Sequence, residues 1–162
     1  MEGVDKSALV ASLREQIARE IAIMKKAARD AADAATHEEA KPENDKDTRG
    51  LEASYLARGQ AERVRELERS DNALQFLAIR DPGEGARVAL GALVTIDEAG
   101  LPATYFVCPV GGGMRVKTAN VDVLVVTPQS PVGQALVGKE VGDVVQVRIR
   151  GGTRQLEVVE VR

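Results

Sequence analysis

The hydrophobic positions of this chain follow two different periods, one in each half. Between residues 7 and 40, apolar side chains recur every three or four residues, the spacing of one helix face. This stripe runs through Val10, Leu13, Ile17, Ile21, Met24, Ala28, Ala31 and Ala35. A second stripe in residues 51–79 runs through Leu56, Gln60, Val64, Leu67, Asp71, Leu74 and Ala78. Two such helices joined by a short segment predict an antiparallel αα-hairpin.

The predicted hairpin is long and has little apolar width. At 1.5 Å per residue, about 30 residues make an arm roughly 45 Å long. Such a narrow stripe predicts a projecting antiparallel coiled coil that no other domain covers. The first stripe narrows to alanine as it approaches residue 35, so the backbone of the partner helix can come closer at that end.

Beyond a turn-rich segment at residues 81–85, the period changes to that of a sheet. Runs rich in β-branched residues predict strands at 87–97, 103–109, 121–127, 143–150 and 154–161. Gly151 and Gly152 predict a hairpin between the last two. One short helix is predicted in "SPVGQALVGK", with Ser130 as N-cap, Pro131 in the first turn and Gly138 at the end.

The predicted fold class is therefore α+β: an N-terminal antiparallel coiled-coil αα-hairpin followed by a small, mainly antiparallel β domain with one short helix. We expect the hairpin to span residues 1–80 with its tip at about 41–50, a linker at 81–85 and the second domain at 86–162.

Composition narrows the function classes. Of the 162 residues, 44% are hydrophobic and 29% charged, and the formal net charge is −3. So small a charge predicts bulk affinity for neither nucleic acid nor a membrane. The single cysteine, Cys108, allows no internal disulfide, and no signal peptide or membrane span is apparent. We expect a cytoplasmic protein and a monomer, with pairing between the hairpins of two chains left open.

Three features that resemble catalytic or ligand-binding motifs have simpler interpretations. The glycine-rich residues 109–117 lack the spacing of a phosphate-binding loop, which favours a hairpin turn. Cys108 is interpreted as a buried strand residue, because the single histidine, His37, lies on the helical arm. We interpret His37 as a solvated helix residue, and no His/Cys metal site is predicted.

Charged residues on the arm and its tip leave two interpretations open. The basic side chains of the arm are interleaved with acidic ones, which fits either a solvated face or a track along nucleic acid or an acidic wall. These side chains are Arg14, Arg19, Lys25, Lys26, Arg29, Arg58, Arg63, Arg65 and Arg69. The tip carries Glu43, Asp45 and Asp47 between two helical patterns. These carboxylates form either a solvated turn or ligands for Mg²⁺ in another protein's cavity.

The C-terminal stretch carries a specific resemblance. Residues 127–161 contain the pattern S-P-x-x-x-A-L-x-G-K-x-x-G-D followed by a strand, a glycine turn and a final strand. The matching residues are Ser130, Pro131, Ala135, Leu136, Gly138, Lys139, Gly142 and Asp143. This pattern resembles the end of the Gre transcript-cleavage factors of bacterial RNA polymerase, and the order of hairpin, linker and β domain extends the resemblance over the whole chain.

The resemblance implies both a fold and a role. It implies that the second domain is FKBP-like and docks at the polymerase secondary channel, with Ser130, Pro131, Gln134 and Lys139 on the docking face. The arm would enter the channel, where tip acids act on a Mg²⁺ shared with the polymerase, and no cofactor would be bound stably. The chain itself would be an accessory factor with no catalytic residues of its own. It would act through the polymerase's nuclease activity and reach the 3′ end of backtracked RNA only indirectly.

The tip departs from the family pattern D-x-x-E-N-x-E-Y. Aligning on Tyr55 places Thr48 and Leu51 where the two acids belong, and aligning on Glu43 places Ala40 at the aspartate position. What carries over is acidic character, in Glu43, Asp45, Asp47 and Glu52, with Asp45 and Asp47 as the expected metal-binding pair. Two hypotheses follow: stimulation of RNA cleavage, or regulation of transcription without cleavage. A third is an FKBP-like peptide-binding module with a coiled-coil adaptor, which the scarcity of aromatic residues disfavours.

Overall fold

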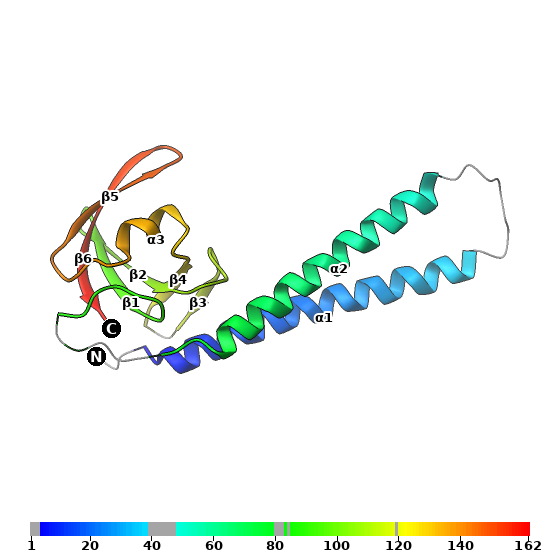
Figure 1. Cartoon of the computed structure of the whole chain (residues 1–162), viewed down its shortest axis with the longest axis horizontal. Helices are drawn as coiled ribbons and strands as arrows, with labels where there is room; N and C mark the ends of the chain where they lie inside the picture. Colours follow the sequence, from blue (N-terminus) through cyan, green and yellow to red (C-terminus); the bar gives the residue numbers. More distant parts are fainter. Residues whose placement is uncertain (1–3, 39–47, 80–82, 84, 119) are drawn as a thin grey trace. The chain divides into compact units, whose positions relative to one another are not determined.

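A computed structural model describes residues 4–38, 48–79, 83, 85–118 and 120–162, with the side chains of 34–38 and 48–53 left out. The chain divides into two compact units: residues 15–72, and residues 1–14 together with 73–162. The elements follow the order of a helical hairpin and then a sheet domain (Figure 1). This confirms the α+β class and the helical hairpin.

The hairpin consists of two long helices, α1 (Lys6–Glu38) and α2 (Thr48–Gln75). In unit 15–72, Ile17 and Leu67 are buried, with 2% and 6% of their surface exposed. Further along the arm, the side chains of Ile23 and Leu56 are 69% and 65% exposed. Apolar burial therefore decreases from the Ile17 end of the arm toward residues 38 and 48.

The predicted close approach at the alanine end is wrong. Ala28 and Ala31 are exposed, and the ribbons of α1 and α2 separate toward residues 38 and 48 (Figure 1). Alanine allows two backbones to come close, but its methyl group buries too little apolar area to hold them there.

The second unit contains a six-stranded sheet in the order β3-β4-β2-β1-β6-β5. Its strands are β1 (Leu93–Glu98), β2 (Leu101–Val107), β3 (Arg115–Lys117), β4 (Asp122–Val126), β5 (Val144–Ile149) and β6 (Gly152–Val161). Neighbouring strands are antiparallel except β2 and β4, which are parallel. The short helix α3 (Pro131–Leu136) contacts β5. The mainly antiparallel sheet with one short helix is as predicted.

The core of this unit comes from the inward positions of the strands and α3. Val145 and Val147 alternate with exposed residues on β5, as a half-buried strand requires. They belong to one cluster with the other buried residues Val88, Ala92, Val94, Ile96, Tyr105, Val107, Val126, Leu136, Leu156 and Val158. The cluster joins the sheet and α3 into one packed body.

Two strand predictions need correction. The strand predicted at 87–97 begins only at Leu93, because Gly91 has a φ of 82° and its N–H bonds to the Val107 carbonyl. Residues 109–117 were interpreted as a turn, but Arg115–Lys117 form β3 after the turn. Only Val116 is buried between its two exposed neighbours, and three residues are too few for an alternating pattern to be recognised.

Candidate functional site

The helix predicted to dock is built as the sequence suggests. Ser130 is its N-cap, and the Ser130 hydroxyl accepts a hydrogen bond from the Gly133 N–H at 3.1 Å. The same hydroxyl donates to the Thr127 carbonyl at 2.7 Å. Pro131 occupies the first turn, where its missing N–H costs nothing. Ser130 therefore connects the start of α3 to the end of the preceding strand.

Gly133 lets α3 lie directly against this connection. A Cβ atom at this position would lie 1.9 Å from the Thr127 carbonyl oxygen, far inside van der Waals contact. Only a residue without a side chain fits here. The sequence alone does not reveal this requirement, because a single glycine in a short helix has the pattern of a weak helix former and nothing more.

The rest of the motif shapes the turns after α3. Gly138 and Gly142 have φ values of 83° and 91°, in the region that glycine enters without strain. The Asp143 carboxylate accepts a hydrogen bond from the Glu140 N–H at 3.0 Å. Gly138 and Lys139 exchange backbone hydrogen bonds with Val88 at 2.8 and 2.7 Å. Most motif residues thus hold the backbone in place.

The side chains left for a partner are few. Pro131, Gln134 and Lys139 are exposed and Ser130 is half-buried. The Gln134 side chain donates to the Gln129 carbonyl at 3.0 Å, which fixes its position on α3. Three valines next to α3 in the sequence are also exposed: Val137 (41%), Val141 (59%) and Val144 (52%). Hydrophobicity alone predicts that these valines are in the core, so their exposure has no signal in the sequence.

The tip acids cannot be placed against these side chains. Glu43, Asp45 and Asp47 lie outside the described residues, and Glu52 is described only as part of the α2 backbone. The expected metal-binding role of Asp45 and Asp47 therefore stays a prediction. Within the described ranges, no group of three or more His, Cys, Asp or Glu side chains could hold a metal ion.

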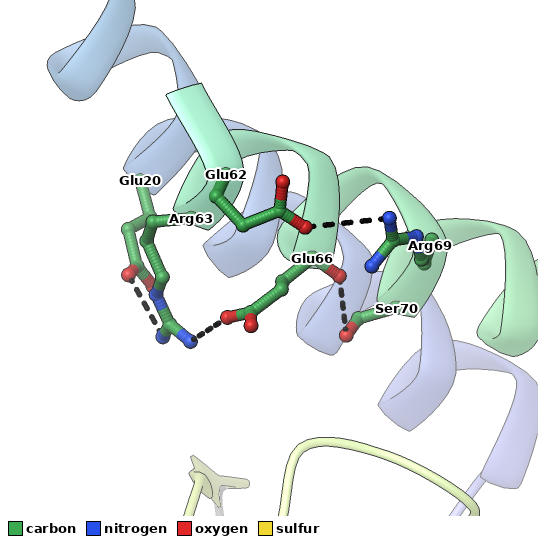
Figure 2. Close-up of polar contacts among 6 residues, drawn as sticks. All are labelled: Glu20, Glu62, Arg63, Glu66, Arg69 and Ser70. Carbon is green, nitrogen blue, oxygen red and sulfur yellow. Dashed lines mark hydrogen bonds and ion pairs between the residues drawn. The ribbon is translucent and has the colours of Figure 1, made fainter. Parts of the chain in front are cut away.

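Ion pairs between the two helices connect the middle of the arm. The Arg63 guanidinium lies 3.3 Å from Glu20 on α1 and 3.4 Å from Glu66 on α2 (Figure 2). Lys25 on α1 pairs with Glu68 on α2 at 2.9 Å. All of these side chains are about half exposed, so each pair contributes at most about 1 kcal/mol.

A polar recess of about 510 Å³ lies on the sheet unit, between the turn after β1 and strand β6. Arg154 makes a two-pronged hydrogen-bonded ion pair with Glu98 there. The hydrogen bond from the Arg154 guanidinium is the largest influence and lowers the pKa of the Glu98 carboxyl; desolvation opposes it, and the charge of Arg154 lowers the pKa further. The pKa of Arg154 is raised by the same contact, so both groups stay charged at neutral pH.

Cys108 is fully buried beside the sheet, as the sequence predicted. Burial raises the pKa of its thiol, and a backbone hydrogen bond at Val110 offsets this only in part. A thiol kept in its neutral form is a poor nucleophile. This agrees with the interpretation of Cys108 as a packing residue.

The helical arm and the mixed sheet with its one capped helix define a class of two-unit α+β proteins. Comparison with known proteins indicates which members of that class this chain resembles. Residues 84–162 match the family model described as "Transcription elongation factor, GreA/GreB, C-term". The transcription elongation factor GreA of Thioalkalivibrio sulfidiphilus is 33% identical over 103 residues, 62% of this chain and 61% of that protein. GreA of Clostridium perfringens strain 13 is 49% identical over 37 residues, 23% of each chain. Residues 84–162 are therefore similar to the C-terminal part of transcription elongation factors of the GreA/GreB family.

The matched stretch spans about 61% of the length of the first of these relatives. Among solved structures, Thermus aquaticus Gfh1 is 22% identical with a TM-score of 0.39, covering 91% of this chain and 92% of that one. GreA/GreB from Nitrosomonas europaea is 21% identical with a TM-score of 0.36, covering 59% and 77%. In the described part of the chain, no helix is long and apolar enough to cross a membrane.

Proposed function

We propose that this protein is a bacterial elongation factor that binds RNA polymerase at its secondary channel and stimulates cleavage of backtracked RNA. The sheet unit docks through α3 and its flanking turns, and the arm carries the acidic tip toward the active site. The factor has no catalytic residues of its own and acts through the nuclease activity of the polymerase, in the cytoplasm.

One observation carries this proposal: residues 84–162 match the GreA/GreB C-terminal model, and the residues of its S-P-x-x-x-A-L-x-G-K-x-x-G-D pattern build α3 and its turns. A rigid surface is what a docking face requires, because little ordering remains to be done on binding. Gln134 and Lys139 are the exposed polar side chains on that surface.

At the tip, Glu43, Asp45, Asp47 and Glu52 would supply carboxylates toward a Mg²⁺ that the polymerase holds. Such an ion activates water and stabilises the charge that develops on phosphate during hydrolysis. Asp45 and Asp47 are two apart in sequence and would face the same way in an extended segment.

The altered spacing of the tip acids favours a second candidate function. The family pattern has its aspartate and glutamate three apart, and neither alignment of this chain keeps that pair. A tip that fills the channel without completing the metal site would inhibit or modulate transcription without RNA cleavage.

Docking is tested by reversing charge on the α3 surface. Gln134→Glu combined with Lys139→Glu should raise the Kd for RNA polymerase by about tenfold or more, because a partner surface chosen for a cation now meets carboxylates. The measurement is titration of labelled factor with polymerase core enzyme, with circular dichroism to check that the fold is kept.

The matched control is Gln146→Glu with Arg148→Glu, which makes the same two kinds of change at exposed positions of β5. Its Kd should stay within about twofold of the original. Equal affinity of both double variants would place the docking surface elsewhere on the molecule.

A further inference from the structure

A groove lies between α1 and α2 in the middle of the arm, away from both the tip and α3 in sequence. It encloses about 340 Å³, and its apolar floor is formed by Met24, Ala28, Ala57, Ala61 and Val64. Gln60, Lys25 and Arg65 complete its lining. Neither the docking surface nor the acidic tip accounts for this groove.

The groove exists because the side chains between the helices are small. Ala28, Ala57 and Ala61 are exposed. Ala28 belongs to the apolar stripe of α1, and Ala57 and Ala61 each lie three residues before another groove residue of α2, Gln60 and Val64. Gly59 adds no side chain to this turn of α2, and a Cβ there would meet nothing within 4 Å. In a regular coiled coil, larger side chains from the two helices would interlock at these positions. Here the small side chains leave a trough between the helices.

One cation from each helix lines the trough, Lys25 on α1 and Arg65 on α2, and each has a second cation on the same helix face, which gives one row of cations on each helix. Lys25 and Arg29 are four residues apart on α1, and Arg58 and Arg65 are seven apart on α2, so each pair shares one helix face with the groove-lining residue. Among the described residues, Arg29 and Arg58 form no ion pair. The border is therefore basic on both helices.

The carboxylates near the groove form only weak, solvent-exposed ion pairs. Glu68 pairs with Lys25 at 2.9 Å and Glu62 pairs with Arg65 at 3.2 Å, with both acids 49% exposed. Pairs this exposed contribute little and exchange readily with an incoming acid. A ligand that brings carboxylates can therefore replace them at small cost.

The residues on the groove floor indicate whether the ligand is an acidic protein or a nucleic acid. Single-stranded nucleic acid gains affinity by stacking bases on aromatic side chains, and the described residues that line this groove include no aromatic one. A helix, in contrast, packs an apolar stripe into a trough between two others, as amphipathic helices do in hydrophobic grooves. Carboxylates flanking that stripe would meet both rows of cations.

We propose that this groove binds an amphipathic helix of a partner protein whose apolar stripe is flanked on both sides by Asp or Glu. The helix lies along the arm and forms a three-helix arrangement with α1 and α2. The binding requires neither the α3 surface nor the tip, so it is independent of the proposed docking.

The test uses the full chain and a fluorescently labelled synthetic peptide of about 18 residues, roughly five helical turns. One peptide has a leucine stripe flanked by Glu, and a second has the same stripe flanked by Lys. A single-stranded RNA of similar charge is the third probe. Fluorescence anisotropy should show binding of the Glu-flanked peptide, weakening as salt rises.

Two changes should weaken that binding by about tenfold. Arg29→Glu with Arg58→Glu reverses one cation in each row, and Ala61→Leu fills the floor without adding charge. The control is Arg19→Glu with Lys26→Glu, two exposed cations of α1 that belong to neither row, and its affinity should be unchanged. Circular dichroism checks that helix content is equal in all variants.

Three results would overturn the proposal. One is equal binding of the Lys-flanked peptide, or no binding of either peptide. Another is tighter binding of the RNA than of the Glu-flanked peptide, lost in the Arg29→Glu, Arg58→Glu variant. The third is sedimentation of the chain as a dimer that Ala61→Leu converts to monomer, because a second copy would then occupy the groove.

Discussion

At the scale of single residues, the α3 surface depends on positions that never touch a partner. Gly133 allows the helix to lie against the Thr127 carbonyl, and the Ser130 hydroxyl bonds to both. A small displacement here would shift the exposed Gln134, which is the next residue along α3. The fold therefore requires glycine at position 133, and the position of the α3 surface depends on it.

Gly133→Ala should destabilise the sheet unit by about 3 kcal/mol, the upper part of the range for overpacking, because the atom that it strikes is backbone. Urea unfolding followed by the amide resonances of each unit would measure it. The matched control is Gly59→Ala, which meets nothing within 4 Å inside α2. That change should stabilise the arm by up to about 1 kcal/mol, since alanine favours helix. Equal stability of Gly133→Ala and the original chain would contradict the close packing described.

At the scale of elements, the ion pair between Glu98 and Arg154 connects the end of β1 to β6 across the polar recess. These strands are neighbours in the sheet, and a β-bulge shifts their register between Thr95 and Ile96. The pair lies beyond the bulge, where it helps to hold the strand ends together.

Stability at low pH tests this pair. The pKa of Glu98 is lowered in the folded state, so its contribution is present above the unfolded value and is lost as pH falls through the folded value. The stability difference between the original chain and Glu98→Gln should therefore be largest at neutral pH and shrink below about pH 4.5. Thermal unfolding at a series of pH values measures this difference. Glu157→Gln, in the same recess, is the control, and a difference for Glu98→Gln that does not change with pH would rule out the assigned role.

The elements could largely be predicted from local patterns, and their arrangement could not. Both arm helices, α3 with its cap, and the turn at Gly151 and Gly152 follow from periodicity and glycine placement. The parallel pairing of β2 with β4 joins strands distant in sequence, and nothing local marks it. A hydrophobic pattern does not show which parts of the fold leave a side chain uncovered. The exposure of the arm groove and of Val137, Val141 and Val144 could therefore not be predicted.

At the scale of the whole molecule, the proposed function needs two parts that can be separated by experiment: a unit that docks and an arm that reaches. The boundary between them was predicted at residues 81–85, where Pro and Gly follow the second helical pattern. Linkers composed of small and polar residues are preferred sites of proteolytic cutting. We therefore expect limited proteolysis to cut at 81–85 before it cuts the sheet. Mass spectrometry of the first fragments would show this, and a first cut within β1–β6 would argue against the boundary.

Function at the tip should be separable from docking in the same way. Asp45→Asn with Asp47→Asn should abolish the effect on transcription while polymerase affinity changes by less than about twofold, because the α3 surface is intact. Asp30→Asn with Asp33→Asn removes two carboxylates from the arm instead and should leave activity unchanged. A loss of polymerase binding in the tip variant would mean that these acids serve docking.

The most direct measurement of the central claim is the length of the RNA in a stalled, backtracked elongation complex after this protein is added. We expect the transcript to become shorter from its 3′ end with the original chain. With the Asp45→Asn, Asp47→Asn variant, at a concentration that saturates the polymerase, we expect no shortening. Transcripts of unchanged length with the original chain, at the same saturation, would contradict cleavage stimulation. If RNA synthesis were also slowed, the result would support the non-cleaving regulator instead.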